Sequence, residues 1–169
     1  GTAGFGATSD LAPRLLLNLS GLKATIVPYK GAGPAIQDLI GGFVDGVIDQ
    51  TATLLPLHAA GSVTALAVTG DSRLPQAPDV PTFAEAGLPE FGMKVWNALA
   101  VHKDTSPAIV ERLVAALDKS LSSDFVRTRF EGLAVPVPPA AIRGPKHLGQ
   151  LVKTEVERWE AVLKDVPKE

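Results

Sequence analysis

The sequence predicts an α/β protein whose first hundred residues build a mainly parallel sheet. Short runs dominated by β-branched residues alternate there with segments whose apolar residues recur at helical spacing. Glycine or proline bounds nearly every segment, which indicates short connections. Strands that alternate with helices through short links form parallel sheets covered by helices on both faces. We therefore expect residues 1–91 to form one compact α/β unit.

The elements of this unit are expected in close succession. The predicted strands are KATIVPY (23–29), VDGVID (44–49) and VTALAVTG (63–70). The predicted helices are SDLAPRLLLNLSG (9–21), with Ser9 or Asp10 as cap and Gly21 as stop, GPAIQDLIGG (33–42), with Pro34 in its first turn, and TATLLPLHAAG (51–61). A proline-rich surface connection follows over 71–92, with one short helical piece near 82–86.

The remaining residues are predicted to be mostly helical. MKVWNALAVH (93–102) has a strand pattern, and 92–102 is expected to act as a crossover between the α/β unit and a helical part, 103–169. Helices are expected after the Ser106 cap with Pro107 as first residue, over 124–132, and over 146–166. The last helix carries an apolar stripe made of Leu148, Leu151, Val152, Val156, Trp159 and Leu163.

Composition excludes several classes of function. The chain has 16 Lys and Arg against 18 Asp and Glu, and no basic run, so nucleic acid is not an expected partner. It has no cysteine, which excludes disulfides and thiolate chemistry. The three histidines, His58, His102 and His147, lack the spacing of metal ligands, and we predict no metal site. The first residues resemble neither a signal peptide nor a membrane span, and the chain is expected to be part of a longer protein.

Three loops are candidate ligand contacts because they follow predicted strands or precede predicted helices. They are GTAGFGATSD, YKGAGP and DQTAT. Ligands of open parallel sheets bind outside the carboxyl ends of the strands. Helix starts there leave unpaired amides and a partial positive charge, which suits a small carboxylate.

A connective role for the same residues remains open at this level. Glycine before a helix is usually turn geometry, Asp49 suits a helix cap, and Lys30 suits a solvated surface position. Enzyme motifs are missing: GTAGFG lacks the G-x-G-x-x-G spacing, and no nucleophile elbow or metalloprotease motif occurs. Binding without catalysis is the leading interpretation, with no cofactor. A nucleotide-dependent α/β enzyme using the glycine loop is the alternative.

The motifs VPYKGAGPA, DLIGGFVD, LAVT and DVPTFAEAG together resemble the solute-binding receptors of tripartite tricarboxylate transporters, the Bug-type periplasmic proteins. The resemblance continues through SPAIVERLVAALDKSL to EVERWEAVLK and covers nearly the whole chain. It implies a two-lobed, type II Venus-flytrap fold, of which this chain supplies one complete lobe and the carboxy-terminal part of the other.

The resemblance also implies a function. Such receptors capture a small carboxylate and deliver it to the membrane permease of the transporter. The implied location is the periplasm, with a signal peptide in the precursor. The carboxylate is held by loop amides and hydroxyls, which map onto Gly4, Gly6, Thr8, Ser9, Tyr29, Lys30, Gly31, Gly33, Asp49 and Thr51. The truncated chain is expected to leave its carboxy-terminal stripe uncovered, which favours self-association.

Two neighbouring positions depart from the pattern of the family. Asp10 stands where the family commonly has histidine, and Ala7 replaces a hydroxyl residue. A carboxylate in the first turn stabilises a helix, but we expect it to compete with an anion bound nearby.

Overall fold

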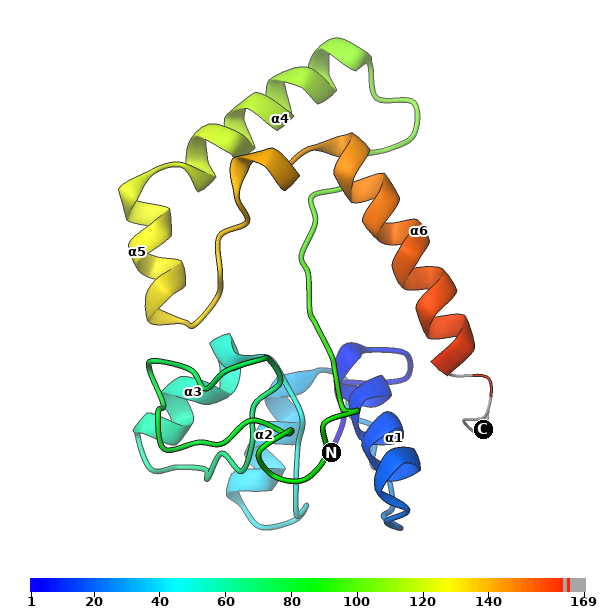
Figure 1. The fold of residues 1–169 in the computed structure, drawn as a ribbon, viewed down its shortest axis with the longest axis vertical. Helices are drawn as coiled ribbons and strands as arrows, with labels where there is room; N and C mark the ends of the chain where they lie inside the picture. Colours follow the sequence, from blue (N-terminus) through cyan, green and yellow to red (C-terminus); the bar gives the residue numbers. More distant parts are fainter. Residues whose placement is uncertain (163, 165–169) are drawn as a thin grey trace. The chain divides into compact units, whose positions relative to one another are not determined.

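The computed structural model describes residues 1–162 and 164. These residues fall into two compact units, Gly1–Val95 and Trp96–Lys164, which are described separately. The first unit contains α1 (Thr8–Ser20), α2 (Ala32–Ile40) and α3 (Thr51–Ala59) (Figure 1). The second contains α4 (Pro107–Leu121), α5 (Asp124–Gly132), the 3₁₀ turn η1 (Ala140–Ile142) and α6 (Pro145–Val162).

Parallel pairing in the first unit is restricted to isolated bridges. Thr2 pairs with Pro28 and Val68 pairs with Thr82, both in parallel orientation. The direction agrees with the prediction, but among the described residues the predicted strands, 93–102 included, do not extend into a continuous ladder. The Ala3 amide, the next after Thr2, donates to Ser9 Oγ at 2.9 Å and not to a neighbouring extended stretch.

The helix ends of this unit follow the predicted glycine stops. Gly21, at φ 68°, ends α1 in the left-handed conformation that glycine adopts without strain. The predicted cap of α1 is wrong, because the helix begins at Thr8 after Ala7, which has no side-chain acceptor. Ser9 and Asp10 lie inside the first turn, and their side chains bond the preceding loop instead.

The core of the first unit joins α1 and α2 to the proline-rich connection. Its buried apolar residues are Ala12, Leu15, Ala35, Ile36, Ala77, Val80, Phe91 and Met93. Phe83 packs on Phe91 with their ring centroids 4.2 Å apart. The connection thus contributes three of these eight core residues, Ala77, Val80 and Phe91, although the sequence predicts a surface segment.

The predicted helical piece near 82–86 is a single turn and not a helix. The Thr82 amide donates to Glu85 Oε2 at 2.8 Å, and the Glu85 amide donates to Thr82 Oγ1 at 3.1 Å, as in a capping box. Arg73 Nε donates to the same carboxylate at 2.9 Å, which lowers the pKa of Glu85. Gly87, at φ 92°, then turns the chain away before a second turn forms.

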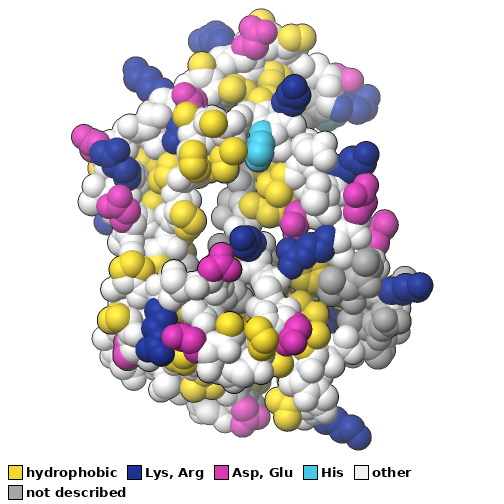
Figure 2. All heavy atoms as spheres, viewed as in Figure 1, with side chains coloured by type: hydrophobic (Ala, Val, Ile, Leu, Met, Phe, Trp, Pro, Cys, Tyr) yellow, Lys and Arg dark blue, Asp and Glu magenta, His cyan; other side chains and the backbone are white. Residues whose placement is uncertain are grey.

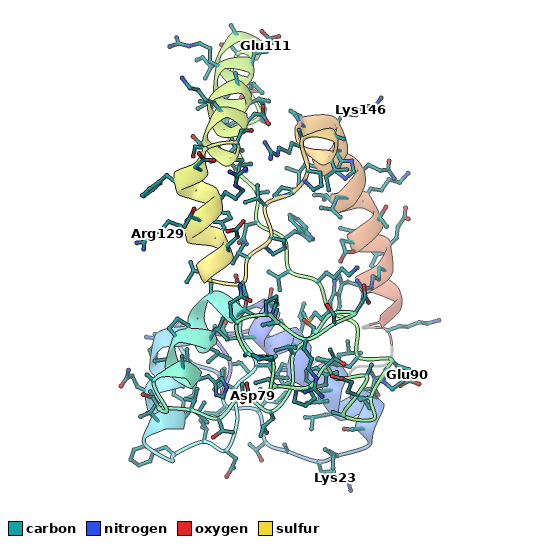
Figure 3. All side chains as sticks on the ribbon, turned by 60° about the vertical axis from the view of Figure 1, so that its left-hand side comes forward. Lys23, Asp79, Glu90, Glu111, Arg129 and Lys146 are labelled. Carbon is teal, nitrogen blue, oxygen red and sulfur yellow. The ribbon has the colours of Figure 1, made fainter. Side chains whose placement is uncertain are left out.

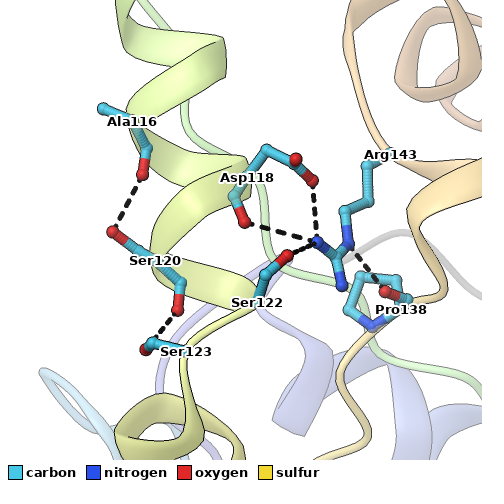
Figure 4. A network of polar contacts seen from close by, with 7 residues as sticks. All are labelled: Ala116, Asp118, Ser120, Ser122, Ser123, Pro138 and Arg143. Atoms are coloured by element: carbon cyan, nitrogen blue, oxygen red, sulfur yellow. Dashed lines mark hydrogen bonds and ion pairs between the residues drawn. The ribbon is translucent and has the colours of Figure 1, made fainter.

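The second unit begins as predicted, with Ser106 before Pro107 at the start of α4. The bounds of α5 also match the predicted 124–132, and Ser123 Oγ accepts the Val126 amide at 3.4 Å. Arg143 joins the end of α4 to the segment before α6 (Figure 4). Its guanidinium donates to Asp118 Oδ1 at 2.7 Å and to the Pro138 carbonyl at 2.8 Å.

Apolar side chains of the second unit remain accessible. No described residue of Trp96–Lys164 is buried, and apolar atoms reach the surface over its helices (Figure 2). In the predicted α6 stripe, Val152 and Val156 are exposed while Trp159 is half-buried, and Leu163 lies outside the described residues. Charged side chains such as Glu111, Arg129 and Lys146 project from the helices (Figure 3). In the described part of the chain, no helix combines the length and apolar character needed to cross a bilayer.

Candidate functional site

Three stretches of the first unit are joined to one another by hydrogen bonds of the backbone. The Thr2 amide donates to the Val27 carbonyl at 2.9 Å, and the Tyr29 amide donates to the Thr2 carbonyl at 2.9 Å. On the other side, the Gly1 amino group donates to the Gly46 carbonyl at 2.8 Å. Each stretch then leads into a helix, and because the first two run in parallel, the starts of α1 and α2 follow the same end of that pair.

The first turns of these helices carry amides with no acceptor among the described residues. They are the amides of Thr8 and Ser9 in α1, Gly33 in α2 and Thr51 in α3. An unpaired first-turn amide donates readily to an anion, and the helix dipole adds to the attraction. Four of the ten predicted ligand residues therefore offer free backbone donors.

The glycine loop before α1 is held by its own side chains. Ser9 Oγ accepts the Ala3 amide, and Asp10 Oδ2 accepts the Gly6 amide at 3.0 Å. The amide of Gly6 is therefore already used within the loop. Gly4, at φ 120°, lies so close to the Tyr29 carbonyl that a Cβ there would meet the oxygen at 3.2 Å. Glycine is required at this approach between the first and second loops.

Asp10, which the sequence leads us to expect as a competitor of a bound anion, is a buried and ion-paired residue. Asp10 is 1% exposed, and Arg14 Nε lies 3.2 Å from the Asp10 carboxylate. Arg14 also lies over the Phe5 ring, 5.7 Å from the centroid. The pair neutralises the buried charge beneath the loop. Sequence reasoning missed Arg14, although the i,i+4 spacing of Asp and Arg within one helix was a readable signal.

The second loop contains two residues engaged in protein contacts and two that remain accessible. The Gly31 amide donates to the Ala3 carbonyl at 3.1 Å, which ties this loop to the first. The Tyr29 hydroxyl donates to Asp38 Oδ2 at 2.6 Å. Lys30 is exposed, and a Cβ added at Gly33 would meet nothing within 4 Å. Asp38, missed by the sequence reasoning, therefore fixes the Tyr29 ring.

The third loop places Asp49 immediately before the α3 cap. Gln50 is the N-cap residue, so the expected capping role of Asp49 is wrong. Asp49 Oδ1 accepts the Gln50 amide at 2.7 Å, whereas Oδ2 is buried and has no donor among the described residues. Among the described residues, no hydrogen bond or ion pair joins Asp49 or Thr51 directly to the other two loops. The second and third stretches both approach Gly1: a Cβ added at Gly1 would lie 3.3 Å from Tyr29 Cε2 and 3.3 Å from Val47 Cγ2.

Thr2 is a further polar residue that the sequence reasoning missed. It is 1% exposed, and its Oγ1 has no hydrogen-bond partner among the described residues. The described histidines do not gather with acidic residues into a group that could hold a metal. His58 Nδ1 accepts the Ala65 amide at 3.4 Å, which gives it a local structural role.

The contact between Tyr29 and Asp38 predicts that the Tyr29 hydroxyl has a raised pKa. The hydrogen bond to Asp38, followed by desolvation, raises the pKa of Tyr29. The stabilising contact is complete below the pKa of the unfolded tyrosine and is lost as the pH rises through the folded value. Since the chain has one tyrosine, tyrosinate absorbance reports this group alone. Asp38→Asn is expected to lower the pKa of Tyr29 towards its ordinary value. Asp45→Asn, a change at an exposed position, is expected to leave that pKa unchanged. Equal tyrosinate titration curves for the two variants would contradict the contact.

Comparisons with known proteins agree with this architecture. The family model for the tripartite tricarboxylate transporter family receptor matches residues 1–167. A UPF0065 protein of Agrobacterium vitis is 44% identical over 168 residues, which cover 99% of this chain and 49% of the relative. The chain thus spans about half the length of the curated relatives it matches.

Solved structures show the same likeness. MatC from Rhodopseudomonas palustris with bound malate is 41% identical, with a TM-score of 0.91 over 96% of this chain and 55% of that protein. The periplasmic binding protein BugD is 33% identical, with a TM-score of 0.92 over 99% of this chain and 56% of that protein. The fold is therefore that of about half a periplasmic solute-binding protein, and the chain belongs to the tripartite tricarboxylate transporter receptor family.

Proposed function

We propose that the three loops of the first unit bind a carboxylate group of a small organic acid. The observation that carries the proposal is the set of unpaired first-turn amides at Thr8, Ser9, Gly33 and Thr51, which follow three stretches joined by hydrogen bonds of the backbone. Lys30, exposed on the second loop, adds a positive charge near this end. Malate bound by MatC is an acid of this class.

The binding unit is part of a larger receptor in this proposal. Residues 1–91 form the ligand-binding lobe, 92–102 form the crossover, and 103–169 belong to the other lobe of a Venus-flytrap receptor. The complete protein delivers the acid to the membrane permease of a tripartite transporter. It works in the periplasm, is made with a signal peptide, and catalyses no reaction. The family match and the likeness to periplasmic BugD support these assignments.

The alternative, a nucleotide-dependent enzyme, has less support from the loop itself. A phosphate-binding glycine loop turns its amides towards the phosphate. Here the Gly6 amide is taken by Asp10 Oδ2, and a carboxylate lies beneath the loop. A nucleotide would have to displace this contact.

Gly33→Val tests the carboxylate site. A side chain at Gly33 meets no protein atom within 4 Å and its backbone is not in the left-handed region, so we expect stability to change by no more than about 0.5 kcal/mol. The added methyl groups crowd the Gly33 amide, and we expect malate affinity to fall about tenfold, equivalent to about 1.4 kcal/mol. Calorimetric titration measures this change.

Gly149→Val is the matched control, because Gly149 is also a helical glycine with open space around it, in α6. It is expected to leave malate affinity unchanged. Unchanged affinity in folded Gly33→Val would contradict the second loop as a carboxylate cradle.

A further inference from the structure

Asp49 carries a buried acceptor two residues before Thr51, the first residue of α3, whose amide the proposed function uses. Its Oδ1 accepts the Gln50 amide at 2.7 Å, and its Oδ2 is buried without a donor among the described residues. Nearly all buried polar atoms of folded proteins have a hydrogen-bond partner, because an unpaired one loses its hydration without compensation. The unpaired oxygen therefore leaves room for a donor from outside the described residues, such as a bound solute.

The local pairing sets Val47, two residues before Asp49, beside Gly1. The bond from the Gly1 amino group to the Gly46 carbonyl sets Gly1 opposite Val47, and the Val47 side chain lies on the face of the Gly1 Cβ position. Side chains alternate along extended chain, so Asp49 shares the face of Val47, two residues further towards the carboxyl end. Tyr29 Cε2 lies against the same Gly1 position.

The chemistry of the missing partner is restricted. A second carboxylate facing Asp49 Oδ2 would be repelled, because both groups are acceptors of the same charge. A hydroxyl or an ammonium group donates to it. If the carboxylate of the acid lies on the first-turn amides, a donor on the adjacent carbon is the nearest group able to reach Asp49.

We propose that Asp49 selects organic acids that carry a hydrogen-bond donor, hydroxyl or ammonium, on the carbon next to a carboxylate. This inference rests on the proposed function, since it requires the carboxylate to occupy the loop amides. It assigns Asp49 a role in specificity, whereas the amides of Thr8, Ser9, Gly33 and Thr51 hold the carboxylate that all such acids share.

Three four-carbon dicarboxylates that differ at one position provide the test. Succinate has no donor at the second carbon, L-malate has a hydroxyl, and L-aspartate has an ammonium group. Calorimetric titration of the chain should show malate or aspartate, or both, binding roughly ten- to a hundredfold more tightly than succinate, the range expected for a hydrogen bond to a charged group. Comparison of malate with aspartate then distinguishes the two donors.

Asp49→Asn assigns the preference to this residue. Asparagine keeps an oxygen for the Gln50 amide and turns its NH₂ to the position of Oδ2, so it replaces the acceptor by a donor of the same shape. We expect the preference over succinate to disappear, while Asp45→Asn, an exposed change on the same segment, preserves it. Circular dichroism confirms that both variants are folded.

The outcomes separate this inference from the proposed function. Equal affinities for the three acids, or a preference that survives in Asp49→Asn, overturn the role of Asp49 and leave the carboxylate site standing. Absence of binding by all three acids overturns both. Tighter binding of succinate than of malate and aspartate also overturns the inference.

Discussion

Replacing Asp10 by alanine is expected to lower the free energy of unfolding of the Gly1–Val95 unit by about 3–5 kcal/mol. The carboxylate is almost fully buried, receives the Gly6 amide, and lies 3.2 Å from Arg14 Nε. Its removal leaves the Gly6 amide without its acceptor and a largely buried guanidinium, 12% exposed, without this counter-charge. Hydrogen exchange of the α1 amides under native conditions measures the change.

A double-mutant cycle isolates the contribution of the pair. Arg14→Met removes the guanidinium but keeps most of the aliphatic length, and Asp10→Ala in that background is expected to cost much less than in the parent. Asp10→Asn keeps an acceptor for the Gly6 amide and should fall between the parent and Asp10→Ala. A loss below about 1 kcal/mol for Asp10→Ala would contradict the interpretation of the pair as the support of the glycine loop.

The apolar surface of the second unit predicts that the chain associates when it is alone. Ile109, Leu113 and Leu117 form a stripe on α4 with exposed fractions of 52%, 37% and 41%. Contiguous apolar surface of this kind rarely stays uncovered in a monomer. Light scattering is expected to show dimers or larger species, and Leu113→Glu to reduce them. Glu111→Gln, on the same helix, is the control, and a strict monomer would contradict this prediction.

The same surface predicts a gain of function by complementation. In a two-lobed receptor, both lobes contact the solute and exclude water. A polypeptide equivalent to the half of the relatives that this chain does not match should cover the α4 and α6 surfaces and complete the site. We expect malate affinity to rise at least about a hundredfold, equivalent to about 2.7 kcal/mol. Equal affinity of the isolated and complemented chain would show that the loops of the first unit suffice.

Local signals in the sequence predicted helices better than pairing between strands. Gly21 ends α1 as predicted because the left-handed conformation at this position is a property of glycine itself. The strand predicted over 23–29 pairs with Thr2 only at an isolated bridge, and beyond it the Ala3 amide donates to Ser9 Oγ, a contact six residues apart that periodicity does not reveal. The same contact explains the wrong cap, since Ser9 bonds the loop and not the helix amides.

Prediction of the candidate site followed the same division. The residues of the three loops could be named from glycines, helix starts and the family motifs, because these are local features. The partners that hold them could not, with the exception of Arg14 at i,i+4 spacing. Asp38 reaches Tyr29 across the turn into α2, and the unpaired state of Asp49 Oδ2 depends on the packing of separate segments. Such facts exist only once the chain is folded.

Titration of the isotopically labelled chain with L-malate, followed through backbone amide chemical shifts, tests the central claim most directly. The account predicts that the amides of Thr8, Ser9, Gly33 and Thr51 shift together along one saturation curve, because one anion contacts the starts of three helices. Amides of α4 should not follow that curve. Saturable shifts confined to Trp96–Lys164, or loop shifts caused by nucleotides and not by malate, would contradict it.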